Sequence, residues 1–93
     1  MRTLEDCRKE LDELDNVLID AYLRRLALSK EIGCIKEALG MAIYDKAREE
    51  AIIRHRTAAL KAEQAASVAA LYCTIFKESK RIQAELAYEK RNT

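Results

Sequence analysis

Arg25 and Lys36 are two cations that a helix would carry on one face. They are eleven residues apart, almost three helical turns, so a helix would point both in one direction about 16 Å apart. Arg25 also falls at an apolar position of a seven-residue repeat, where an unpaired buried guanidinium costs several kcal/mol. The simpler interpretation is a structural ion pair with an acid on a neighbouring helix. The alternative is that both long side chains reach inward and hold one small anion.

A second pair of polar residues enters an apolar stripe near the C-terminus. Ser79 and Gln83 are four residues apart and share a helical face, which Tyr72 and Phe76 continue. A hydroxyl and an amide therefore interrupt a face that is otherwise apolar. Taken alone, Gln83 would be interpreted as a solvated residue near a helix end.

Asp45, Arg48 and Glu49 lie on one turn in the middle of the sequence. Alone they predict a helix cap and a surface ion pair. With Arg25 and Lys36 they give three cations against two acids. This balance favours a site for an anion, with carboxylates available to accept hydrogen bonds from hydroxyl groups.

Arg8 cannot reach such a site within one chain. It precedes Arg25 by 17 residues and Lys36 by 28, which is about 26 and 42 Å along one helix. In an antiparallel pair of these helices, the N-terminus of one chain lies beside the later half of the other. Arg8 of the partner subunit could then complete the pocket. Four cations and two acids leave two positive charges, which suits a dicarboxylate.

The composition favours helix almost everywhere, because Pro is absent, Gly occurs twice, and Ala, Leu, Glu, Lys and Arg dominate. Thr3 begins a capping-box pattern, Gly40 supplies a C-cap, and a heptad repeat of apolar residues lies between them. This predicts a first helix over residues 4–39, about 54 Å long. No compact monomer of 93 residues has a core of that length. The sequence therefore predicts an all-α single domain over residues 1–93, in an intertwined antiparallel homodimer.

Two shorter helices are expected after the first, giving three helices per chain. Asp45 is a good N-cap for the second helix, which would carry Ile52, Ile53, Ala59 and Leu60 on its apolar side. The third is predicted over about residues 67–90, with a cap at Ser67. The break between them is therefore expected near residues 62–66.

Charge and cysteine content exclude several functional classes. A net charge of +1 lacks the basic excess of a nucleic-acid binder, and neither a membrane-spanning run nor a signal-peptide pattern is present. We therefore expect a cytoplasmic protein with no nucleic-acid or membrane partner. Cys7, Cys34 and Cys73 are odd in number and widely spaced, so we expect buried, reduced thiols rather than a zinc site or a disulfide framework. His55 is expected on a helix surface, and no nucleophile motif is present.

The ordered set of polar residues resembles the chorismate mutases of the all-helical class. The resemblance covers nearly the whole chain, and the matching segments are Arg8 to Asp15 (RKELDELD), Arg25, Ile32-Gly33-x-x-Lys36, Asp45-x-x-Arg48-Glu49 and Ser79-x-x-x-Gln83. It implies an intertwined three-helix homodimer with two equivalent sites. It also implies an isomerase that converts chorismate to prephenate by a Claisen rearrangement, in the biosynthesis of phenylalanine and tyrosine. No metal, cofactor or covalent intermediate is expected.

The resemblance also implies roles for the carboxylate-binding and catalytic residues. Arg25 and Arg8 of the partner subunit would bind the two carboxylates of the substrate, and Ser79 would assist one of them. Lys36 and Gln83 would donate hydrogen bonds to the ether oxygen, which gains negative charge as its bond breaks.

The remaining residues would hold the ring of the substrate. Glu49, with the Asp45 region, would bind the ring hydroxyl, and Arg48 would line the site. Two other functions remain open: an isochorismate-pyruvate lyase on the same scaffold, and a non-enzymatic helical dimerisation module with Arg25 in a structural ion pair. The position of Glu49 favours the mutase over the lyase.

Overall fold

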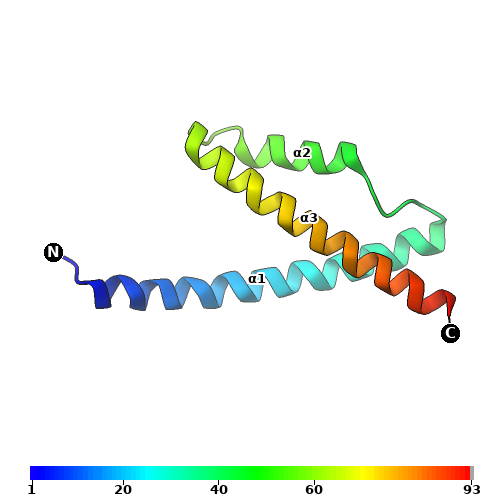
Figure 1. Ribbon diagram of the computed structural model, residues 1–93, viewed down its shortest axis with the longest axis horizontal. Coiled ribbons are helices and arrows are strands. Elements are labelled where there is room, and N and C mark those ends of the chain that lie inside the picture. The colour runs from blue at the N-terminus through cyan, green and yellow to red at the C-terminus, as the bar shows by residue number, and fades with distance from the viewer. Residues whose placement is uncertain (93) are drawn as a thin grey trace.

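The computed structural model describes residues 1–92, which form three helices and no strand. Helix α1 spans Leu4–Leu39, α2 spans Lys46–Thr57 and α3 spans Ala62–Arg91. Helix α3 packs against both of the others and crosses the C-terminal half of α1 (Figure 1). The predicted all-α class, with three helices and a very long first helix, is confirmed.

Helix α1 begins and ends where its caps predict. The Thr3 hydroxyl accepts a hydrogen bond from the Asp6 backbone N–H (3.1 Å), and the Asp6 carboxylate accepts one from the Thr3 N–H (3.0 Å). These two bonds form the capping box, and the hydrogen bonds from Thr3 hold the pKa of the Asp6 carboxyl below its usual value. At the other end Gly40 adopts a left-handed conformation with φ 67°, and its N–H bonds back to the last turn.

The junction between α2 and α3 differs from the prediction. Asp45 caps α2 as expected, but the helix ends at Thr57, so Ala59 and Leu60 lie in the turn that follows. Helix α3 begins at Ala62, and the break lies at residues 58–61 rather than 62–66. The expected cap at Ser67 is therefore wrong.

The break lies upstream of Ser67 because it forms without a capping side chain. The Leu60 N–H bonds to the Thr57 carbonyl (3.0 Å) and closes a turn. Lys61 is extended (φ −65°, ψ 153°) and precedes α3 without a side-chain cap. The following residues, Ala62 to Ala66, are mostly strong helix formers, so α3 continues upstream of Ser67.

The chain leaves an unusual amount of surface exposed. Its radius of gyration is 17.1 Å, whereas a compact domain of this length would have about 12 Å. Its accessible surface is 7687 Å², about 2,200 Å² more than a folded monomer of this mass exposes. Among the described residues, Phe76 is the only apolar side chain that is buried. A single chain therefore lacks the apolar core that normally stabilises a domain.

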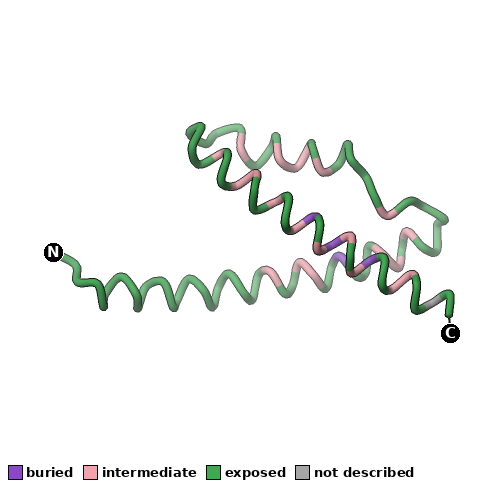
Figure 2. The backbone as a smooth tube through the Cα atoms, viewed as in Figure 1, coloured by how far each residue is buried: buried purple, intermediate pink, exposed green. Residues whose placement is uncertain are grey.

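The uncovered surface is concentrated on the first half of α1. Every residue up to Ala21 is exposed, and Figure 2 shows this half of the helix extending away from α2 and α3. It carries a set of large apolar side chains that are more than half exposed: Leu4, Leu11, Leu14, Val17, Leu18 and Ile19. Four of them, Leu4, Leu11, Leu14 and Leu18, are residues that the heptad repeat assigned to a helix–helix interface.

The three cysteines are free, but the expectation that they are buried is wrong for the chain by itself. Cys7 and Cys73 are exposed, and Cys34 is half-buried. His55 is exposed on α2, as expected. No helix in residues 1–92 combines the length and the hydropathy needed to cross a membrane.

We expect Gly40→Ala to destabilise the protein by about 1 kcal/mol, because alanine pays a steric cost at positive φ. A Cβ at this position would meet no other atom within 4 Å, so the effect isolates the backbone conformation. Urea unfolding at a fixed chain concentration measures the change. Gly40→Asn is the matched control and should lose less, since asparagine tolerates this conformation. Equal stability of the alanine variant and the wild type would contradict the cap.

Candidate functional site

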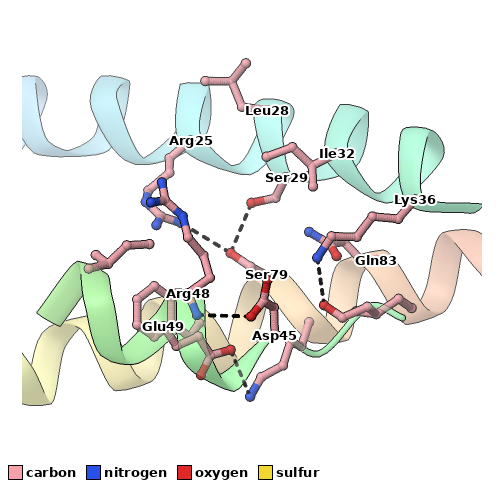
Figure 3. A pocket seen from close by; sticks show the side chains of 14 residues that line it. Arg25, Leu28, Ser29, Ile32, Lys36, Asp45, Arg48, Glu49, Ser79 and Gln83 are labelled. Carbon is pink, nitrogen blue, oxygen red and sulfur yellow. Dashed lines mark hydrogen bonds and ion pairs between the residues drawn. The ribbon is translucent and has the colours of Figure 1, made fainter. Parts of the chain in front are cut away.

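A pocket of about 510 Å³ lies where the second half of α1, the start of α2 and the middle of α3 meet. Figure 3 shows polar side chains from all three helices entering it. Seven of the eight residues singled out from the sequence line this pocket: Arg25, Lys36, Asp45, Arg48, Glu49, Ser79 and Gln83. Arg8 does not line it and is exposed on the uncovered half of α1.

The α1 wall of the pocket has the predicted helical spacing. Arg25, Ser29, Ile32 and Lys36 follow at intervals of four, three and four residues and so share one face. The Lys36 ammonium donates a hydrogen bond to the Ile43 carbonyl in the linker between α1 and α2 (3.0 Å). This bond holds the end of the lysine side chain beside the linker, within the pocket.

Two buried serines connect α1 to α3. The Ser29 hydroxyl donates a hydrogen bond to Ser79 Oγ (3.1 Å), and Arg25 Nη1 lies 3.5 Å from the same oxygen. Because Ser79 Oγ accepts these contacts, its own proton remains available for an acceptor in the pocket. Ser29 was not predicted from the sequence. Its four-residue spacing from Arg25 is the signal that could have found it.

Arg25 is supported by aromatic rings rather than by a carboxylate. Its guanidinium carbon lies 5.7 Å from the centre of the Phe76 ring and 5.9 Å from that of Tyr72. None of the ion pairs formed by residues 1–92 includes Arg25. The structural ion pair that was the simpler interpretation of Arg25 is therefore not found in this part of the chain.

The first turn of α2 forms the acidic side of the pocket. The Asp45 carboxylate accepts a hydrogen bond from the Arg48 N–H (3.0 Å), which is the predicted cap. Glu49 Oε2 lies 3.3 Å from the Lys80 ammonium, which also lies 4.4 Å from the centre of the Tyr44 ring. The ion pair expected within this turn is not found among the described residues; Glu49 pairs with Lys80 of α3 instead. Lys80 was missed, although it follows Phe76 by four residues and so shares its helical face.

Gln83 is the most clearly unsatisfied polar group of the site. The residue is 7% exposed. Its Oε1 is the one buried side-chain oxygen or nitrogen in the described residues without a hydrogen-bond partner. Buried polar groups in native proteins are nearly always paired, so this oxygen calls for a hydrogen-bond donor, such as a water molecule or a group of a ligand in the pocket.

The pocket is cationic and has two distinct ends. Its lining includes Arg25, Lys36, Arg48 and Lys80 against Asp45 and Glu49, a formal excess of two positive charges. The Arg25 and Arg48 guanidinium groups lie at one end, and the Lys36 amine and the Gln83 amide lie at the other (Figure 3). Guanidinium groups suit carboxylates, whereas the ammonium and the amide can donate to a single oxygen atom. No group of three His, Cys, Asp or Glu residues within residues 1–92 is placed to hold a metal ion.

Comparisons with known proteins identify the family of this all-helical chain. The family model described as chorismate mutase type II matches residues 7–84, and the chain belongs to this family. The resemblance inferred from the ordered polar residues is therefore confirmed.

Two relatives define how far the similarity extends. The T-protein of Haemophilus influenzae is 40% identical over 65 residues, which is 70% of this chain and 17% of that protein. The chorismate mutase of Methanocaldococcus jannaschii is 39% identical over 49 residues, which is 53% of this chain and 50% of that protein. The matched region thus spans half or less of each relative's length. No solved structure matches the chain.

The buried serine pair can be tested by a double-mutant cycle. Ser29→Ala should cost about 1 kcal/mol of unfolding free energy, because it removes the donor to the buried Ser79 hydroxyl. Adding Ser79→Ala should cost little more, because both partners are then apolar. Urea unfolding gives the coupling free energy, and Ser67→Ala on the exposed face of α3 is the control. Strictly additive losses would show that the two hydroxyls do not interact.

Proposed function

We propose that this chain is a chorismate mutase, an isomerase that converts chorismate to prephenate in aromatic amino-acid biosynthesis. Its family membership and the relative named chorismate mutase support the assignment. The observation that carries it is the convergence of Lys36 and Gln83 on one end of a cationic pocket whose other end holds Arg25. This arrangement suits a dicarboxylate with an ether oxygen between its two reacting halves.

Binding of the two carboxylates is proposed to fix the conformation of the substrate. Arg25 would bind one carboxylate, supported from behind by the Phe76 and Tyr72 rings, and the free proton of Ser79 would assist. Arg8 of the partner subunit would bind the other. The flexible substrate is thereby restricted to the conformer whose reacting carbons are adjacent, which removes an entropic part of the barrier.

The chemical step is proposed to depend on two donors at the ether oxygen. In the rearrangement one carbon–oxygen bond breaks as one carbon–carbon bond forms, and the departing oxygen becomes enolate-like. The Lys36 ammonium and the Gln83 amide would donate to this oxygen. Because the charge on it grows only as the bond breaks, these donors stabilise the transition state more than the substrate. No atom is added or removed in the proposed rearrangement, and we expect it to use no metal, cofactor or covalent intermediate.

The acidic side of the pocket is proposed to recognise the ring hydroxyl of chorismate. Glu49, held by Lys80, would accept a hydrogen bond from it, together with the Asp45 region. Arg48 would line the same wall. An isochorismate-pyruvate lyase would need to bind a hydroxyl at another ring position, and a dimerisation module would not need the pocket. We further propose that the enzyme works in the cytoplasm, consistent with its three free cysteines.

The functional unit is proposed to be an antiparallel homodimer. The uncovered apolar half of α1 would pack against the same helix of a second copy, which would account for the excess exposed surface. Within one chain, Arg8 lies about 26 Å along the helix from Arg25 and cannot reach the pocket. In the antiparallel dimer, Arg8 of the partner subunit would lie at the pocket. The proposed site is incomplete without the second chain.

Lys36→Ala should lower kcat by about 10²–10³, because it removes a donor to the developing enolate. The assay follows the loss of chorismate and the appearance of prephenate, with isochorismate as a parallel substrate. Lys30→Ala, on the exposed surface of the same helix, should retain wild-type activity. Pyruvate release from isochorismate with no turnover of chorismate would identify the lyase instead, and inactivity toward both would leave the dimerisation module.

A mixture of two inactive variants should regain activity if Arg8 acts across the dimer. Arg8→Ala and Lys36→Ala homodimers should each be nearly inactive. After unfolding and refolding of equal amounts, half of the dimers are mixed, and each mixed dimer carries one intact pocket. About a quarter of full activity should therefore return, from the twofold symmetry of the assembly.

Sedimentation of each variant supplies the control for that experiment, since both must form dimers of about twice the 10.6 kDa chain mass. Variants that dimerise but remain inactive after mixing would exclude the shared pocket. A well-folded monomer would exclude the dimer itself.

A further inference from the structure

Gly33 lies against Gln83 where α1 and α3 cross. A Cβ atom built on Gly33 would lie 2.9 Å from Gln83 Cγ, 3.3 Å from its Cβ and 3.6 Å from its Cα. The first distance is shorter than atoms of this kind tolerate, and the second is tight. The two helices can therefore approach this closely only because residue 33 has no side chain.

A glycine at this position is unfavourable for the helix itself. Gly33 lies well inside α1, where a glycine weakens a helix relative to alanine because it loses more backbone freedom on folding. Its φ is not in the left-handed region, so the backbone conformation does not require glycine. The close approach of α3 is the feature of the structure that does require it.

The residue that occupies this space belongs to the pocket. Gln83 is buried, and its Oε1 lacks a partner among the described residues. Gly33 precedes Lys36 by three residues, so the same face of α1 carries the contact with Gln83 and the lysine amine. The Lys36 and Gln83 side chains both line the pocket, and Figure 3 shows them at the same end of it.

We propose that Gly33 is a positioning residue, which seats Gln83 so that its amide and the Lys36 ammonium meet the same substrate oxygen. The inference rests on the proposed mutase function. A methyl group at residue 33 leaves two ways to relieve the contact. Either the Gln83 side chain rotates at its first bonds, or α3 moves away from α1. Both displace the amide at the end of the side chain, because Cγ and Cβ lie between it and the backbone.

The expected result of Gly33→Ala is a decrease of kcat on the order of tenfold or more, since small displacements of catalytic groups are costly. If the Gln83 side chain rotates, KM should change much less than kcat, because Arg25 binds the carboxylate; if α3 moves, Ser79 moves with it and KM should rise as well. A double-mutant cycle with Gln83→Ala tests whether residue 33 affects catalysis through Gln83. Gly33→Ala should slow the wild-type background but leave the Gln83→Ala enzyme as fast as it was, because the amide is already absent.

Each outcome decides the proposal. Normal kcat in Gly33→Ala overturns it, and so does an equal loss in both backgrounds, which would mean that residue 33 affects the pocket as a whole. If Gly33→Ala alone does not fold, Gln83→Ala should restore folding, because it removes the crowded Cγ and leaves only the 3.3 Å contact with Cβ, which a shift of a few tenths of an ångström relieves. Failure of the double variant to fold would also overturn the proposal. An inactive wild-type chain that folds and dimerises would instead refute the mutase function on which the proposal rests.

Discussion

The crossing of α1 and α3 is the contact on which the rest of the chain depends. It buries Phe76 together with three polar side chains, Ser29, Ser79 and Gln83. Polar groups contribute little net stability and cost free energy when unpaired, so this crossing cannot replace an apolar core. The apolar surface that would form such a core is instead exposed along the first half of α1. The chain thus places its candidate site where a monomer would place its core, and its large apolar side chains lie on another surface.

The charged side chains around the crossing of α1 and α3 are also unbalanced. Arg25, Lys36 and Arg48 converge on one pocket, and like charges at this proximity repel. Partial compensation comes from the Glu49–Lys80 ion pair and from the rings beneath Arg25, but a net positive charge remains. An anion of two charges would offset the excess that a single chain supplies, so the same arrangement of cations favours a dicarboxylate.

Features that depend on spacing within one helix could be predicted from the sequence. The capping box, the heptad repeat and Gly40 predicted α1 at its observed bounds, and the Arg25–Lys36 and Asp45–Glu49 spacings predicted residues that line one pocket. Features that depend on contacts between helices could not. Lys80 pairs with Glu49 only because α3 packs beside α2, and the break at residues 58–61 uses a backbone turn rather than a capping residue such as Ser67. The role proposed for Gly33 likewise depends on the distance to another helix.

The length of α1 connects these observations. The half that α3 covers carries Arg25 and Lys36, whereas the half that nothing in the described chain covers carries Arg8 and the exposed leucines. A second copy packed on that half would cover the leucines. The same contact would place Arg8 of the partner subunit at the pocket. In the proposed dimer, folding, association and completion of the site are therefore linked equilibria, because each lacks a component that only the partner chain supplies. A separate apolar core in each chain would uncouple them, and the burial pattern of this chain provides none.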